Sequence, residues 1–250
     1  NLVKQLVEQD WEITALHRAE SDLSPLKQLP VDFAEGSLTD LPSLQKAMPK
    51  DIDVVFHLAG DTNMWSQNNE RQTEINVTGT QNMVQVSAKK NVGTFIHTSS
   101  VSAWGSMDGT ITEESPQHGG ESWVNYERTK WLSEREALKG RNQNIKVVIM
   151  NPAMVVGPHD TNNWGRLFFA LQDDDLPGVT HGNMSVAHVK EVVKAHISAA
   201  EQGSDGERYI LGGQNCTFAE FVSIIAEISD ISAKPKIIPP AILKLAAYFQ

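Results

Sequence analysis

Cysteine, positive charge and long apolar runs are all scarce in this 250-residue chain. The single cysteine, Cys216, excludes an intramolecular disulfide framework and fits a reducing compartment. The formal net charge of -10 argues against a protein that binds nucleic acid through a basic face. No apolar stretch approaches the roughly 20 residues of a membrane-spanning helix, and no signal peptide opens the chain. We therefore expect a cytoplasmic protein with neither a nucleic-acid nor a membrane partner.

Metal-ligand patterns are lacking too. His181, His188 and His196 fall in one region, but their spacing matches no zinc motif and cysteine partners are missing. The acidic run at 173–175 does not show the alternating ligands of a calcium loop. We therefore expect no metal site.

The residues that are present have the balance of a globular protein, with 40% hydrophobic and 21% charged residues. Apolar strand-like runs alternate with helical patterns over the first 157 residues. The strand-like runs are 11–18, 52–60, 92–100 and 145–157, and the helical patterns are 41–48, 74–91 and 125–140. Near-continuous apolar strands separated by helices predict a parallel sheet covered on both faces, a doubly wound α/β arrangement.

After Gly157 the chain becomes richer in Gly, Asn and Asp. We expect a helix over 186–203, a strand over 206–213 and a helix over 217–230 that begins with a capping box, Thr217 and Glu220. We assign residues 1–157 to the main domain. Residues 158–250 are assigned to a mainly substrate-binding region, with segments that return to the main sheet.

Both ends of the sequence stop inside apolar helical patterns. Leu2, Val3, Leu6 and Val7 have helical spacing with no start signal before them, and the last dozen residues likewise end within such a pattern. We therefore expect the sequence to be a fragment of a longer protein.

Three of the predicted strands end in small or polar residues, at 57–60, 97–100 and 151–158. The carboxyl ends of parallel strands meet at one edge of a sheet, where α/β proteins bind their ligands. These residues would therefore line one cleft. For any single strand, a loop that begins where the strand stops is an equally good interpretation.

Tyr126 and Lys130 lie four residues apart on a predicted helix, and so on one face of it. A nearby ammonium group would lower the pKa of a phenol from its ordinary value near ~10 towards the range useful for acid–base work. A serine hydroxyl opposite would polarise a carbonyl group. Such a set suits hydride exchange between a carbonyl and a nicotinamide. On its own, the Y-x-x-x-K spacing is weak evidence, because it is more typical of an ordinary helix surface.

The ordered series HLAG, INVTGT, HTSS, YERTK and NPAMVVGP resembles the extended short-chain dehydrogenase/reductase superfamily. Within it, the chain is most similar to the NAD-dependent epimerase/dehydratase family and its bacterial dihydroflavonol reductase-like members. The resemblance covers nearly the whole chain and implies a Rossmann-type fold. It implies a catalytic set of Ser100, Tyr126 and Lys130. Ser100 is preferred to Ser99 because the superfamily's serine is the last of its group.

The resemblance also implies a cofactor-binding set. Lys130 would hold the nicotinamide ribose as well as assist Tyr126, and Asn76 has either a structural or a catalytic role. The remaining positions of this set are Arg18, Ser37, Leu38, Leu58, Ala59, Gly60, Tyr126, Pro152 and Val155. Ser37 stands where relatives often carry an aspartate that reads the adenine.

Arg18 bears on the choice of cofactor. An acidic residue after the second strand of such a sheet binds the ribose 2′-hydroxyl, whereas arginine accommodates a 2′-phosphate. We therefore favour NADP(H) over NAD(H), although a surface arginine could also follow a strand by chance. The glycine-rich loop that holds the pyrophosphate does not occur in the 250 residues, and we expect it upstream of Asn1.

The predicted activity is reduction of a ketone or aldehyde, with Tyr126 as the proton donor. One alternative is a nucleotide-sugar epimerase or dehydratase with tightly bound NAD. The loop at 157–175 offers Arg166 but little other positive charge for a diphosphate, which favours the reductase. A non-catalytic dinucleotide sensor is the second alternative, although it would have no need of the catalytic set. The resemblance also implies a homodimer.

Overall fold

The computed structural model describes residues 1–160, 163–176, 178–231 and 236–239, which form two compact units. The first unit consists of Asn1–Pro152 and Val193–Leu211, and the second of Ala153–Val192 and Gly212–Gln250. The chain thus leaves the first unit after Pro152 and returns to it at Val193.

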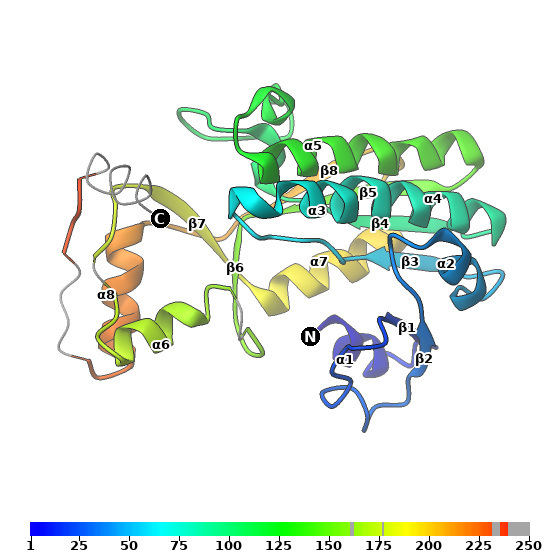
Figure 1. Ribbon diagram of the computed structural model, residues 1–250, viewed down its shortest axis with the longest axis horizontal. Coiled ribbons are helices and arrows are strands. Elements are labelled where there is room, and N and C mark those ends of the chain that lie inside the picture. Colours follow the sequence, from blue (N-terminus) through cyan, green and yellow to red (C-terminus); the bar gives the residue numbers. More distant parts are fainter. Residues whose placement is uncertain (161–162, 177, 232–235, 240–250) are drawn as a thin grey trace. The chain divides into compact units, whose positions relative to one another are not determined.

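The first unit is an α/β structure with parallel strands, as the sequence predicts (Figure 1). Its two sheets have the orders β1-β2 and β3-β4-β5-β8, and the strand pairs within them are parallel. The strands are β1 (Thr14–His17), β2 (Asp32–Glu35), β3 (Val54–His57), β4 (Thr94–Thr98), β5 (Lys146–Pro152) and β8 (Arg208–Leu211).

Helices cover both faces of the four-stranded sheet. The helices that contribute to this unit are α1 (Leu2–Val7), α2 (Leu41–Ala47), α3 (Asn69–Thr73), α4 (Gly79–Lys89), α5 (Asn125–Leu138) and most of α7 (Val189–Gln202). Because successive strand residues point to opposite faces, Phe95 packs with residues of α2, α4 and α5, whereas Ile96 packs with residues of α7. Figure 1 shows α4 and α5 on one side of the sheet and α7 on the other.

The second unit has its own sheet, in the order β6-β7-β9. Its strands are β6 (Met154–Val156), β7 (Asn183–His188) and β9 (Gln214–Thr217), and its helices are α6 (Arg166–Gln172) and α8 (Phe218–Ile228). The predicted capping box of α8 is confirmed, because Thr217 and Glu220 bond each other's backbone N–H groups.

Two sequence-based boundaries are wrong. The run 145–157 is not one strand, because β5 ends at Pro152 and β6 begins at Met154 in another sheet. Proline has no N–H to donate, so strand pairing stops there. The predicted helix over 186–203 begins only at Val189, since residues 186–188 pair with β6 as part of β7. Strand pairing prevails over helical periodicity at these three positions.

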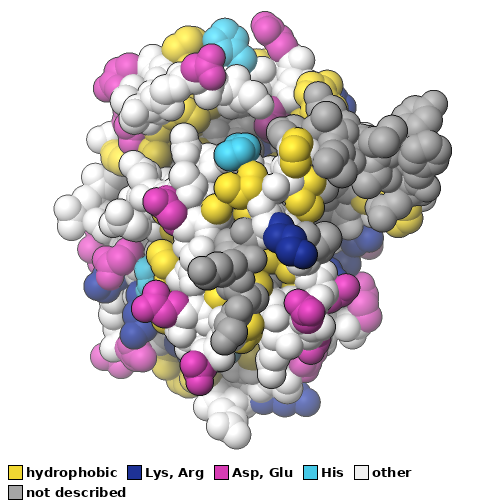
Figure 2. All heavy atoms as spheres, turned by 90° about the vertical axis from the view of Figure 1, so that its left-hand side faces the viewer, with side chains coloured by type: hydrophobic (Ala, Val, Ile, Leu, Met, Phe, Trp, Pro, Cys, Tyr) yellow, Lys and Arg dark blue, Asp and Glu magenta, His cyan; other side chains and the backbone are white. Residues whose placement is uncertain are grey.

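Figure 2 shows acidic side chains over much of one face, several of them next to one another or beside Lys and Arg side chains. Within the described ranges, no helix has both the length and the hydropathy that a bilayer span requires. The same ranges contain no group of three or more His, Cys, Asp and Glu side chains placed to hold a metal ion.

Candidate functional site

The predicted site residues of the first unit lie at the carboxyl ends of its parallel strands. Arg18 follows β1 and Ser37 follows β2, and these ends are tied by a bond from the Gly36 N–H to the His17 carbonyl. Residues 58–60 leave β3 as an exposed segment, and Ser100 follows β4. His57 and His97 are in register on β3 and β4, so these two exits are neighbours.

Ser100, Tyr126 and Lys130 come together at this edge. Tyr126 lies in the first turn of α5, and a hydrogen bond joins its side chain to that of Ser100. The Lys130 Nζ lies 5.8 Å from the centre of the Tyr126 ring and donates to the Thr98 carbonyl at 3.1 Å. The structure thus groups a hydroxyl from the segment after β4 with a phenol and an ammonium from α5.

The pKa of Tyr126 moves in the opposite direction from the one expected. Burial raises it above 10, and the hydrogen bond with Ser100 offsets only part of this rise. In the free protein the phenol is therefore protonated at neutral pH, which is the form of a proton donor.

Lys130 is buried, with only 6% of its surface exposed. Desolvation lowers its pKa from 10.5 to about 8, while the negative charge of Glu134 acts to raise it. Its charge therefore changes just above neutral pH, and small changes in its surroundings decide its protonation there.

Ser99 and Ser100 have different surroundings. Ser99 is buried and its hydroxyl donates to Glu134 at 2.7 Å, inside the protein. Ser100 is only partly buried, accepts the Ser102 N–H at 3.1 Å and bonds Tyr126. This geometry supports the choice of Ser100 for substrate binding.

Asn76 holds the loop after β3 against α5. Its side chain accepts the Asp61 N–H at 2.7 Å, and its amide donates to the Asp61 carbonyl and to Thr129. It lies in a π-helical turn, Glu74–Thr78, between α3 and α4. These bonds give Asn76 a structural role, since they tie the loop to α5 and do not involve the catalytic set.

Replacing Asn76 with alanine should lower the free energy of unfolding by on the order of 2 kcal/mol, because the Asp61 backbone groups lose their partners. Chemical denaturation of wild type and variant measures this loss. Gln81→Ala, a change at an exposed position of α4, serves as the control and should have little effect. Equal stabilities of Asn76→Ala and wild type would contradict the assignment.

Gly60 allows Asn76 and Lys130 to approach this loop closely. A Cβ at Gly60 would stand 3.1 Å from the Asn76 Oδ1 and 3.4 Å from the Lys130 Nζ. With Leu58 and Ala59 it forms an exposed strip next to Lys130. Contact of these three residues with a cofactor stays a prediction.

The residues predicted to lie near the adenine end of the cofactor are exposed or half-buried. The Arg18 guanidinium is exposed and lies 3.3 Å from Glu20, a weak surface pair that a phosphate can displace. The Ser37 hydroxyl lies 3.1 Å from Thr39. The Leu38 carbonyl accepts the Asn82 amide at 2.8 Å, which fixes the loop after β2 against α4.

Pro152 and Val155, the predicted nicotinamide-end residues, belong to different units. Pro152 ends β5 in the first unit, and Val155 lies in β6 of the second. Contact of Val155 with a cofactor stays a prediction.

Glu134, which is fully buried behind Lys130, was not predicted from the sequence. The sequence feature that points to Glu134 is its spacing, because Tyr126, Lys130 and Glu134 follow one another at four-residue intervals on a single helix face.

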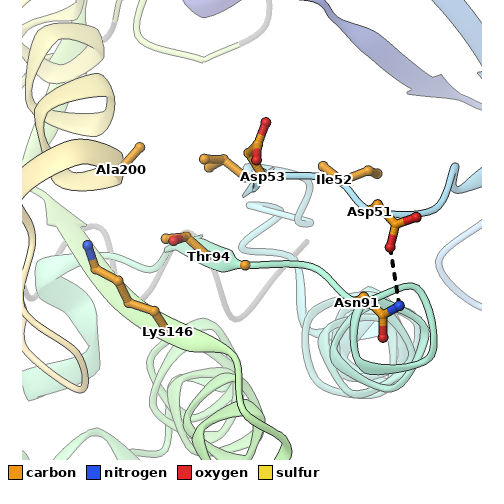
Figure 3. A pocket seen from close by; sticks show the side chains of 9 residues that line it. Asp51, Ile52, Asp53, Asn91, Thr94, Lys146 and Ala200 are labelled. Atoms are coloured by element: carbon orange, nitrogen blue, oxygen red, sulfur yellow. Dashed lines mark hydrogen bonds between the residues drawn. The ribbon is translucent and has the colours of Figure 1, made fainter.

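A hollow of about 580 Å³ lies at the opposite edge of the sheet (Figure 3). Asp53, Thr94 and Lys146 line it near the amino ends of β3, β4 and β5. Asp51 and Asn91 bond each other at its rim. The strands separate this hollow from Ser100, Tyr126 and Lys130.

The chain is similar to known proteins over most of its length. It is 30% identical over 247 residues to a Synechocystis sp. protein named "Putative dihydroflavonol 4-reductase", covering 96% of this chain and 71% of that protein. It is 28% identical to "Sterol demethylase protein B" of Methylococcus capsulatus, covering 98% of this chain and 75% of that protein.

Solved structures share the fold. The crystal structure of gox2253 has a TM-score of 0.89 at 28% identity, covering 99% of this chain and 76% of that one. A double mutant of DesIV, a dTDP-glucose 4,6-dehydratase from Streptomyces venezuelae solved with bound NAD, has a TM-score of 0.83 at 21% identity, covering 95% and 80%.

The model of the NAD dependent epimerase/dehydratase family matches residues 1–212, which include the strand ends and the grouped Ser100, Tyr126 and Lys130. The chain therefore belongs to the NAD-dependent epimerase/dehydratase family, a part of the extended short-chain dehydrogenase/reductase class.

Proposed function

We propose that this protein is an NADP(H)-dependent reductase that converts a ketone or aldehyde to an alcohol. The observation that carries the proposal is the hydrogen bond between Ser100 and a protonated Tyr126 beside the buried Lys130. A substrate carbonyl held by these two hydroxyls receives polarisation from one and a proton from the other. A bound nicotinamide would supply or accept the hydride.

Each residue has a defined task. Ser100 holds the carbonyl oxygen, and Tyr126 gives it a proton as negative charge develops there. Lys130 stabilises the phenolate that remains and binds the nicotinamide ribose. Leu58, Ala59 and Gly60 line the dinucleotide.

The names of relatives support reduction over epimerisation. The Synechocystis protein is named for a reductase, and a Stenotrophomonas maltophilia relative, 25% identical, is a "2-alkyl-3-oxoalkanoate reductase". Arg18 supports NADP(H), because its exposed guanidinium suits a 2′-phosphate.

Incubation of the full-length protein with NADPH and a panel of aldehydes, ketones and nucleotide sugars tests the activity. We expect NADPH oxidation with one or more carbonyl compounds. Conversion of a nucleotide sugar without net NADPH oxidation would favour an epimerase or dehydratase, and cofactor binding with no turnover would favour a sensor.

Substitution of Arg18 by alanine should weaken NADPH binding by about 10- to 100-fold, because a charged hydrogen bond to phosphate contributes about 1.5–3 kcal/mol. NADH binding should change little, since NADH has no 2′-phosphate. Calorimetric titration of both cofactors measures the difference, with Lys27→Ala, at another exposed position of the first unit, as the control. Equal loss of affinity for the two cofactors would remove Arg18 from this role.

A further inference from the structure

Glu134 is a fully buried carboxylate that accepts hydrogen bonds from four side chains. The donors are Ser99 Oγ at 2.7 Å and Asn151 Nδ2 at 2.7 Å to one oxygen, and Gln117 Nε2 at 2.9 Å and Arg208 Nε at 2.8 Å to the other. A carboxylate presents acceptors only, whereas the amide of glutamine would place N–H groups against two of these donors. The four donors therefore select a carboxylate at this position.

One branch of this network reaches Ser100. Asn151, on β5, donates to the Ser100 carbonyl at 3.0 Å as well as to Glu134. Ser99 is held by Glu134 directly. The backbone that presents the Ser100 hydroxyl is thus fixed on both sides by groups that Glu134 anchors.

A second effect of Glu134 falls on Lys130, one helical turn earlier on the same face of α5. Other charged and titratable groups surround this lysine. Burial and the charge of Lys130 lower the pKa of His57 on β3 and of His97 on β4, and Tyr126 lies beside the lysine. Arg208 on β8 pairs with Glu134. Asp61, after β3, lies 3.7 Å from Arg71.

Among these groups, Glu134 is the one that acts to raise the pKa of Lys130 against burial. The carboxylate favours the charged ammonium at neutral pH, and Arg208 moderates its effect by partly neutralising it.

We propose that Glu134 is a positioning residue for the reductase site, which anchors the Ser100 backbone through Ser99 and Asn151 and holds a negative charge behind Lys130. This role rests on the proposed function, since it matters to turnover only if Ser100 and Lys130 serve catalysis. Glu134 touches neither the substrate nor the cofactor in this role.

Two substitutions with opposite expected effects on the Lys130 titration midpoint test the influence of the Glu134 charge. Glu134→Gln should lower the titration midpoint of Lys130 by on the order of one pH unit, because it removes the opposite charge. Arg208→Met should raise that midpoint, because it removes a cation that neutralises Glu134. Arg208 has a partly exposed side chain, so this variant keeps the test valid if Glu134→Gln does not fold.

The midpoint is measured in the full-length protein by NMR of lysine labelled with ¹³C next to Nζ. The Lys130 signal is identified by its loss in Lys130→Arg. Glu136→Gln is the matched control, because Glu136 lies on the same helix and pairs with the exposed Lys139. It should leave the Lys130 midpoint unchanged.

The pH–rate profile gives the second reading. If charged Lys130 is the active form, lowering its titration midpoint by one pH unit lowers the rate of Glu134→Gln about fivefold at pH ~8. The alkaline limb of the variant's pH–rate profile then moves to lower pH by the same amount as the Lys130 midpoint. If Glu134 only filled space, its replacement would change neither the Lys130 midpoint nor the alkaline limb of the pH–rate profile.

Unchanged Lys130 midpoints in both folded variants would overturn the role of Glu134. This outcome is separate from failure of the proposed function, because NMR reads Lys130 without any turnover. A wild-type protein that reduces no carbonyl would contradict the function even if both midpoints shift as expected.

Discussion

Tyr126→Phe should lower carbonyl reduction by about 10²- to 10⁴-fold, the usual contribution of a positioned proton donor. The phenylalanine ring keeps the shape of the site but removes the hydroxyl that bonds Ser100. NADPH affinity should change little, because Lys130 and residues 58–60 are untouched. Steady-state turnover at saturating NADPH, together with a fluorescence titration of the cofactor, separates the two effects.

Tyr209→Phe is the matched control for this experiment. Tyr209 lies on β8, where its hydroxyl accepts the Ser204 N–H and has no part in the proposed chemistry. Turnover of this variant should stay near that of the wild type. An active Tyr126→Phe enzyme would remove Tyr126 from the role of proton donor.

Acid should destabilise the fold strongly because His57 is buried in the neutral form. Burial, and then the charge of Lys130, lower its pKa from 6.5 to about 3. Between these two values the unfolded chain binds a proton that the folded chain does not, so stability falls as the pH drops below 6.5. At pH ~4.5 the loss from His57 alone is on the order of 2–3 kcal/mol.

Hydrogen bonding fixes the tautomer of His57, which burial keeps neutral. The Thr80 hydroxyl donates to the Asn76 carbonyl at 2.7 Å, so the His57 Nε2 must be the donor in its 3.1 Å bond to Thr80. The neighbouring His97 stacks on this ring at 5.5 Å between centroids, and its pKa is lowered for the same physical reasons. Protonation would place charge in this stack beside Lys130.

Urea unfolding at several pH values between about 7 and 4.5 measures the effect. His57→Gln should show a shallower fall in the free energy of unfolding over this range. His181→Gln, a change at an exposed position, should keep the wild-type slope. A slope in His57→Gln equal to that of the wild type would contradict the assignment of acid sensitivity to this residue.

The parallel α/β core is predictable from the sequence because its apolar runs and helical patterns are strong and local. The same locality explains the correct capping box at Thr217. The break at Pro152 and the entry of residues 186–188 into β7 are not predicted, because both depend on strand partners distant in the chain. Periodicity within a segment does not identify the sheet that the segment joins.

The candidate site shows the same division. Strand-end positions, helix spacing and the family resemblance are sufficient to group Ser100, Tyr126 and Lys130. The expected direction of the Tyr126 pKa is wrong because burial, which depends on the assembled unit, outweighs the nearby charge. Glu134 is not predicted because its hydrogen-bond donors are distant in the sequence. Asn151 on β5, Arg208 on β8 and Ser99 after β4 donate to it only in the folded unit.

The most direct test of the proposed function follows a hydride label. Full-length protein is supplied with NADPH deuterated at the transferring position and with a carbonyl compound from the panel that it accepts. Mass spectrometry should find one deuterium in the alcohol, on the former carbonyl carbon, for each NADPH oxidised. Failure of every carbonyl in the panel to acquire deuterium, with a nucleotide sugar converted and NADPH unconsumed, would contradict the reductase assignment.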